Sequence, residues 1–173
     1  MAPRPPDLTI EALAAHHNRD GFSCGVDSLD RYLRTQASQD VRRKANGVFV
    51  LVEPDRPDVV LGYYTLCATG LAQGDVPAVV RKFIPRYPLA SATLVGRLAV
   101  SEARQGERLG AMLLADAVRR AYASAATVGS SMLVVDAISE RAAAFYEGNG
   151  FVRLPDSLRL VLPMRAIRRL VQP

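Results

Sequence analysis

Cysteine and histidine are scarce in this sequence, which has only two of each among 173 residues. Cys24 and Cys67 are too few to build a disulfide framework, and they are not spaced as a pair of metal ligands. His16 and His17 are the only residues that could add imidazole ligands. We therefore expect no structural metal site and two free thiols in a reducing compartment.

Long apolar runs are missing as well. No stretch reaches the roughly 18 uninterrupted apolar residues that a membrane-spanning helix needs. Residues 1–6 contain three prolines and one arginine but no apolar segment of the kind found in secretion signals. The sequence therefore predicts a cytoplasmic protein without a membrane partner.

Lysine is nearly absent, although the net charge is +5. Among the 22 cationic residues only Lys44 and Lys82 are lysine; the others are arginine, whose planar guanidinium suits paired contacts with phosphate. An anionic partner and a compositional bias toward arginine and alanine explain this equally well. With 49% apolar and 23% charged residues, the chain is expected to form a single domain over residues 1–173.

The order of elements expected from hydrophobic periodicity points to an α/β fold. In the first half we expect strands over 8–13, 48–52 and 59–71, a helix from an N-cap at Ser28 to about residue 46, and a helix over 75–84. In the second half we expect strands over 91–100, 132–136, 151–154 and 158–162, with helices over 105–125 and 139–147. This order predicts an α+β arrangement: a mixed, mostly antiparallel sheet with helices on both faces.

The junction between the strand expected over 91–100 and the next helix is the most informative for chemistry. There Gly106 and Gly110 lie in a short turn that leads into a long helix. Such a junction presents unpaired backbone N–H groups and the positive end of a helix dipole, so it can hold a diphosphate; Arg104 and Arg108 would strengthen that hold. The turn has neither the Gly-Lys-Ser/Thr of nucleoside-triphosphate loops nor a G-x-G-x-x-G pattern, which disfavours ATP and nicotinamide cofactors.

Residues 105–111, Gln-Gly-Glu-Arg-Leu-Gly-Ala, resemble the Q/R-x-x-G-x-G/A loop with which GNAT acetyltransferases bind the diphosphate of acetyl-coenzyme A. Arg108 departs from this pattern because the family has glycine there; a residue with a side chain can still donate its N–H if its φ stays negative. The alternative is an ordinary strand-to-helix turn whose glycines only permit packing. The resemblance implies acetyl-coenzyme A as co-substrate without a metal, bound by Leu98, Ala99, Val100, Arg104, Gln105, Gly106, Glu107, Arg108, Leu109, Gly110, Ala111 and Ser139.

A second stretch downstream resembles the same family. Residues 144–151, Ala-Phe-Tyr-Glu-Gly-Asn-Gly-Phe, resemble its A-x-x-F-Y-x-x-x-G-F pattern. In that family the tyrosine hydroxyl protonates the departing thiolate of coenzyme A, and Tyr146 matches that position. The resemblance therefore implies that Tyr146 is catalytic. The alternative is that Phe145 and Tyr146 are both core aromatics.

The N-terminal third resembles one branch of the family. Residues 22–33, Phe-Ser-Cys-Gly-Val-Asp-Ser-Leu-Asp-Arg-Tyr-Leu, resemble the F-x-C-G-x-x-x-L-D-x-Y/W-L opening of GNAT toxins, and residues 95–100 resemble their central strand. This implies the toxin of a type II toxin–antitoxin system, which acetylates the α-amino group of aminoacyl-tRNA and so inhibits translation. It also implies a ribbon-helix-helix antitoxin, with operator DNA bound only through the antitoxin complex. A homodimer is compatible with the sequence.

The residues themselves favour an α-amine as acceptor. The strand region 89–100 contains no Asp, Glu or His, so a strong general base on that strand is absent. An α-amino group has a pKa of about 7.7–8.0, whereas that of lysine is about 10.4, so only the α-amine has a useful neutral fraction at physiological pH. Backbone N–H groups near Leu98 to Val100, freed by a bulge, are expected to polarise the thioester carbonyl.

Basic residues are the candidates for contact with tRNA phosphates, although each alone is more simply explained as a solvated charge: Arg42, Arg43, Lys44, Arg81, Lys82 and Arg97. Cys24 has no His or carboxylate that the sequence places beside it, so we expect a packed or turn cysteine and not a nucleophile. Two other functions remain open. One is acetylation of a small amine or a protein N-terminus, and the other is a catalytically silent domain that binds nucleic acid or a partner.

Overall fold

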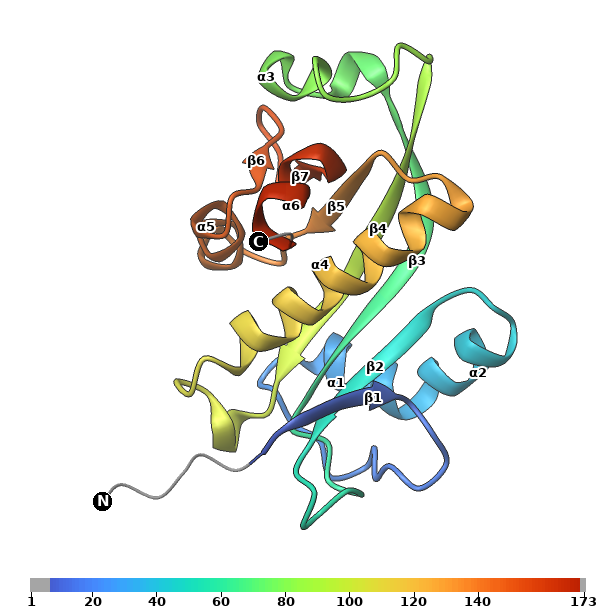
Figure 1. Cartoon of the computed structure of the whole chain (residues 1–173). Helices are drawn as coiled ribbons and strands as arrows, with labels where there is room; N and C mark the ends of the chain where they lie inside the picture. Colours follow the sequence, from blue (N-terminus) through green and yellow to red (C-terminus); the bar gives the residue numbers. More distant parts are fainter. Residues whose placement is uncertain (1–6, 172–173) are drawn as a thin grey trace. The chain divides into compact units, whose positions relative to one another are not determined.

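The computed structural model describes residues 7–171 (Figure 1). Its strands form one sheet in the order β1-β2-β3-β4-β5-β7-β6. β4 and β5 are parallel, whereas β1 with β2, β5 with β7 and β6 with β7 are antiparallel, which confirms the predicted mixed sheet. The strands are β1 (Thr9–Ala12), β2 (Gly47–Val52), β3 (Gly62–Ala72), β4 (Leu89–Val100), β5 (Met132–Asp136), β6 (Val152–Arg153) and β7 (Arg159–Pro163).

The helices differ widely in length, and α4 is the longest of those described. Within residues 7–171, no helix combines the length and the apolar character needed to cross a membrane. The helices are α1 (Asp27–Thr35), α2 (Ala37–Arg42), α3 (Ala78–Arg81), α4 (Leu109–Val128), α5 (Glu140–Gly148) and α6 (Met164–Val171), with short 3-10 turns η1 (Gln73–Asp75) and η2 (Glu102–Arg104).

The chain divides into two compact units, each with its own core. The first unit contains the described residues up to Thr65 together with Arg97–Asp116. The second contains Leu66–Gly96 and the described residues from Ala117 onward. β3, β4 and α4 each contribute residues to both units, so the division does not follow the boundaries of the elements.

The core of the first unit forms between α1 and the N-terminal strands. Leu29 and Leu33 are buried on α1 and belong to the same apolar cluster as Val50 of β2. Tyr63 on β3 completes the cluster, and its hydroxyl donates to the carbonyl of Leu29 at 2.6 Å. β1 runs antiparallel to β2, as the blue and cyan arrows show (Figure 1). Apolar burial of this kind supplies most of the driving force for folding.

The core of the second unit forms on β4, β5 and β7. Ala92 of β4 faces Met132 of β5 in parallel register, and Met132 faces Pro163 of β7 in antiparallel register. Four consecutive residues of β5, from Met132 to Val135, are fully buried. A continuous apolar run of this length is typical of a strand that is covered on both faces.

The helix predicted from Ser28 to about residue 46 is wrong in its details. α1 ends at Thr35 and α2 begins at Ala37, because Gln36 has φ −120° and interrupts the helical path. The N-cap is Val26 and not Ser28, since the carbonyl of Val26 accepts the first helical hydrogen bonds. Ser28 therefore lies inside α1.

Two further helix predictions are wrong in extent, and one helix was not predicted. The helix expected over 75–84 shrinks to the four residues of α3, because Pro77 forces the residue before it into an extended conformation. α4 begins at Leu109, four residues later than expected. α6 follows β7 directly and was missed. The predicted strands are all present: the strand over 132–136 has the predicted ends, and the ends of the others shift by at most three residues.

Candidate active site

The loop before α4 contains two residues in the left-handed conformation. Gly106 has φ +86° and Arg108 has φ +62°, so the condition of a negative φ at Arg108 is not met. An L residue with a side chain costs about 1–2 kcal/mol in this conformation. The carbonyl of Arg108 accepts from the N–H of Met112 at 3.2 Å, which starts the helix. The chain therefore keeps a glycine-like backbone here without the glycine.

The first turn of α4 leaves backbone donors available to a ligand. The N–H groups of Leu109, Gly110 and Ala111 precede the first residue that can be bonded within the helix. Gly106 has open space around the position of a Cβ atom, and residues 105–108 are exposed. N–H groups without a partner in the helix, at the positive end of a helix of 20 residues, suit a diphosphate.

Arg104 is paired with carboxylates on both sides. Its Nε donates to Glu107 at 2.7 Å and its Nη1 donates to Glu53 at 2.6 Å. These bonds, with Glu107 first, raise the pKa of Arg104 above its ordinary value. Arg104 thus ties the loop to the end of β2, and its charge is balanced within the protein. The role of Glu53 was missed because nothing in the sequence marks a pair 51 residues apart.

The segment before α1 is held by a buried carboxylate. Oδ1 of Asp30 accepts from the backbone N–H of Cys24 at 2.9 Å. The thiol of Cys24 donates to the carbonyl of Val26 at 3.6 Å, and burial, assisted by Asp30, raises its pKa to about 11. Cys24 is therefore the packed turn cysteine that we expected. Both cysteines of the chain are free thiols.

Tyr146 lies on α5 in the second unit with 6% of its surface exposed. The ring of Phe145 lies edge-on to it at 5.2 Å and the ring of Phe151 at 5.7 Å. Burial raises the pKa of Tyr146 to about 12, so the phenol keeps its proton throughout the physiological range. The same shift makes the phenol a weaker acid than an ordinary tyrosine, so it does not by itself favour proton donation.

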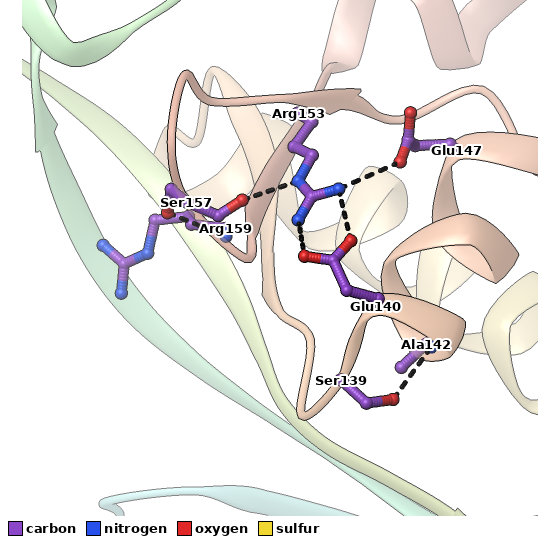
Figure 2. A network of polar contacts seen from close by, with 7 residues as sticks. All are labelled: Ser139, Glu140, Ala142, Glu147, Arg153, Ser157 and Arg159. Atoms are coloured by element: carbon purple, nitrogen blue, oxygen red, sulfur yellow. Dashed lines mark hydrogen bonds and ion pairs between the residues drawn. The ribbon is translucent and has the colours of Figure 1, made fainter.

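Polar contacts fix both ends of α5 (Figure 2). At its start, Oγ of Ser139 accepts from the N–H of Ala142 at 3.1 Å, which is the N-cap bond expected for a capped helix. Arg153 donates two bonds to Glu140, at 2.7 and 2.8 Å, and these lower the pKa of that carboxyl. Arg153 also lies 3.8 Å from Glu147. Ser139 therefore orients the helix that carries Tyr146, and its contact with the co-substrate stays a prediction.

The basic residues predicted to contact tRNA have different surroundings. Arg42, Arg43 and Lys44 are exposed neighbours at the end of α2 in the first unit. Arg97, on β4 in the same unit, is half-buried, and its guanidinium carbon lies 3.6 Å from the centroid of the Tyr32 ring. In the second unit Arg81 donates to the carbonyl of Val76 at 2.9 Å, and Lys82 lies 5.0 Å from the ring of Phe83.

Glu11, His16 and His17 form a cluster whose hydrogen bonds oppose metal binding. Nδ1 of His17 accepts from the N–H of Ala14 at 2.9 Å, so the ring proton lies on Nε2, 2.7 Å from Glu11. If a metal bound Nε2, the ring proton would have to move to Nδ1. There the proton would point at the backbone N–H of Ala14, which already donates to Nδ1. The cluster thus fixes the loop after β1, and these bonds lower the pKa of Glu11. His17 itself is buried, with 3% of its surface exposed.

A mixed sheet and a long helix whose first N–H groups have no partner within the helix are features expected of an acyltransferase that uses a coenzyme A thioester. Residues 45–153 match the model of the acetyltransferase (GNAT) domain. The chain therefore belongs to the GNAT acetyltransferase family.

Comparison with individual proteins points to one group within this family. The chain is 36% identical over 151 residues to a tRNA-acetylating toxin of Mycobacterium tuberculosis (strain ATCC 25618 / H37Rv), covering 87% of this chain and 88% of the relative. A crystal structure of a tyrosine-to-phenylalanine mutant of KacT is 33% identical, with a TM-score of 0.88 and coverage of 94% and 98%. AtaT complexed with acetyl-methionyl-tRNAfMet is 32% identical, with a TM-score of 0.87 and coverage of 95% and 99%. Other similar structures hold AtaT with its antitoxin AtaR and acetyl-coenzyme A, and a KacTA–DNA complex.

Proposed function

We propose that this protein is the toxin of a type II toxin–antitoxin system and transfers acetyl from acetyl-coenzyme A to the α-amino group of aminoacyl-tRNA. The observation that carries the proposal is the similarity to tRNA-acetylating toxins, which extends over nearly the whole chain. The geometry of the loop before α4 supports it, because that loop keeps the left-handed backbone at residue 108 without the usual glycine.

Groups of the chain can bind the diphosphate, polarise the thioester carbonyl and protonate the leaving sulfur. Acetyl-coenzyme A supplies a thioester, and the N–H groups that follow Arg108 bind its diphosphate. Backbone N–H groups of β4 between Leu98 and Val100 polarise the thioester carbonyl. Tyr146 gives its proton to the departing sulfur, which is a step worth about 10²-fold to 10⁴-fold in rate.

The α-amine of the acceptor is sufficiently neutral at physiological pH to attack without a general base on β4. β4 carries no Asp, Glu or His, so the attacking amine must be neutral without help from a carboxylate or imidazole on this strand. The α-amine of an aminoacyl ester meets this condition and water removes its proton, whereas a lysine side chain is almost wholly protonated at physiological pH. Cationic side chains, with Arg42, Arg43 and Lys44 as the exposed group, bind the phosphates of the tRNA.

The partners follow from the same group of relatives. AtaT has been solved with the antitoxin AtaR, and KacTA with DNA. We extend this to a ribbon-helix-helix antitoxin that binds operator DNA together with the toxin, to a homodimer of the toxin, and to action in the cytoplasm. The shared elements β3, β4 and α4 support a single domain over residues 1–173.

Labelled acetyl-coenzyme A tests the proposal directly. The purified protein is incubated with it and charged tRNA, and label is expected on the aminoacyl group. Label on added small amines or peptide N-termini, with none on charged tRNA, would favour a different acetyltransferase. No transfer to any acceptor, despite binding of nucleic acid, would favour a catalytically silent module.

Tyr146→Phe tests the proton donor. The variant keeps the ring and its packing against Phe151, so it is expected to fold and to bind acetyl-coenzyme A with unchanged affinity in calorimetry. Its turnover should fall by about 10²-fold to 10⁴-fold, because the thiolate must leave unprotonated. Turnover equal to that of the wild type would remove Tyr146 from the mechanism.

A further inference from the structure

Two segments far apart in the sequence lie side by side in the first unit. The backbone N–H of Glu102 donates to the carbonyl of Ser23 at 2.8 Å. In return, the hydroxyl of Ser23 donates to Oε2 of Glu102 at 3.1 Å. The turn that precedes α1 is therefore bound to the 3-10 turn η2. Residues 105–108, which follow η2, are called the co-substrate loop below.

The side chain of Gln105 adds a third connection. Its Nε2 donates to the carbonyl of Cys24 at 3.1 Å and to the carbonyl of Val100 at 3.1 Å. A side-chain amide has two N–H groups, so both are used by backbone carbonyls of the protein. Gln105 therefore joins the end of β4 to the turn before α1 and has no N–H left for a bound molecule.

Gly25 lies between these contacts in a conformation that favours glycine. Its φ is +89°, and a Cβ atom added there would lie 2.9 Å from Oε1 of Glu102. Any other residue would be strained in this conformation and would also push against the carboxylate. The buried carboxylate of Asp30 also fixes this turn by accepting a hydrogen bond from the backbone N–H of Cys24.

These contacts help to hold Arg108 in its left-handed conformation. A side-chain-bearing residue stays in the left-handed region only when the surrounding structure determines its conformation, and Arg108 at φ +62° follows Gln105 by three residues. The direction of the N–H groups after Arg108 depends on that conformation. Contacts that fix Gln105 therefore also fix the donors offered to the diphosphate.

We propose that Gln105 and Gly25 are positioning residues, which hold the co-substrate loop on the turn formed by residues 23–25 and so set its affinity for acetyl-coenzyme A. This inference rests on the proposed function, since it assumes that the loop binds this molecule. It differs from a direct role, because the amide of Gln105 acts on protein carbonyls and not on the co-substrate.

Variants of Gln105 separate the two roles. Gln105→Met removes both donors at similar length, and Gln105→Glu places an acceptor opposite two carbonyls. For Gln105→Met we expect both KM and Kd for acetyl-coenzyme A to rise about tenfold. For Gln105→Glu we expect both to rise by more than tenfold. The kcat at saturation and the KM for charged tRNA should stay unchanged. Gln105→Arg retains N–H donors and should restore wild-type affinity.

Gln73→Glu is the matched control. The amide of Gln73 also donates to a backbone carbonyl, that of Pro85 at 3.3 Å, but it lies in the second unit. The same change of charge there should leave KM unaltered. Thermal melting of every variant shows whether the fold is intact.

Gly25→Ala provides a second, independent test. It should also raise KM for acetyl-coenzyme A, because alanine is strained at φ +89° and its Cβ would lie 2.9 Å from Oε1 of Glu102. If the wild type does not bind acetyl-coenzyme A in calorimetry, the proposed function fails. If the wild type binds and the Gln105→Met and Gln105→Glu variants bind equally well, only this inference fails. Tighter, salt-sensitive binding by Gln105→Arg would also overturn it, because that result indicates direct contact with phosphate.

Discussion

Tyr64 on β3 and Asp116 on α4 are joined by a hydrogen bond of 2.6 Å from the tyrosine hydroxyl to Oδ2 of the carboxylate. Both side chains are buried, with 0% and 8% of their surface exposed. Phe49 of β2 stacks on the Tyr64 ring at 5.2 Å. The bond therefore connects α4 with β3 of the first unit.

Tyr64→Phe is expected to lower the free energy of unfolding by about 1.5–3 kcal/mol. The change removes a donor from a buried carboxylate, and the cost of such a loss is the desolvation of the group left behind. Urea unfolding of the two proteins measures the difference. Tyr87→Phe is the control because that tyrosine is 66% exposed, and its stability should match the wild type. Equal stability of Tyr64→Phe and wild type would show that the bond contributes nothing.

The sequence was sufficient for the strands, because runs such as 132–136 have the apolar pattern of buried strands and clear turns on either side. It was also sufficient to place a turn between a strand and a long helix near residues 105–108. The start of α4 was not predictable, since hydrophobic periodicity does not reveal that Arg108 has a positive φ. The partners of Arg104 and Gln105 were missed for another reason: Glu53 and Cys24 lie 51 and 81 residues away, and only the folded chain brings them together.

Arg108→Gly should stabilise the protein by about 0.5–1 kcal/mol. The left-handed conformation of Arg108 costs about 1–2 kcal/mol, and glycine avoids most of this cost while adding some entropy to the unfolded chain. Thermal melting and urea unfolding measure the gain. Arg108→Ala keeps the strain, so it should show no gain. If the alanine variant is stabilised as much as the glycine variant, the benefit comes from losing the charge and not from the backbone.

The lowered pKa of Asp40 leads to a prediction for the stability of the protein at acid pH. Its carboxylate accepts bonds from Gln36 at 2.9 Å, Tyr32 at 2.8 Å and Asn46 at 3.0 Å. These bonds, with Gln36 first and Tyr32 second, hold the pKa of Asp40 below its ordinary value. The folded state therefore resists a proton that the unfolded state accepts. The resulting stability is present above the ordinary pKa of about 4 and is lost as the pH falls through the lower, folded value.

Asp40→Asn removes this titration. We expect the free energy of unfolding of the variant to fall less steeply than that of the wild type between about pH 5 and pH 2, with a difference of at most one proton in the slope. The variant should also be less stable at pH 7, since it loses bonds to a charged acceptor. Urea unfolding at several pH values measures both effects, and parallel curves for the two proteins would contradict the assignment.

The exposed cations at the end of α2 lead to a prediction for tRNA binding. Reversal of Arg42, Arg43 and Lys44 to glutamate should weaken binding of charged tRNA while leaving the affinity for acetyl-coenzyme A intact. If the three side chains contact phosphates, the slope of log affinity against log salt should become shallower by about 2–3. The control reverses Arg56, Arg141 and Arg165, which are also exposed, and so makes the same change in net charge. An equal loss of tRNA binding in the control would show that net charge alone attracts the RNA, and no loss in either variant would place the RNA surface elsewhere.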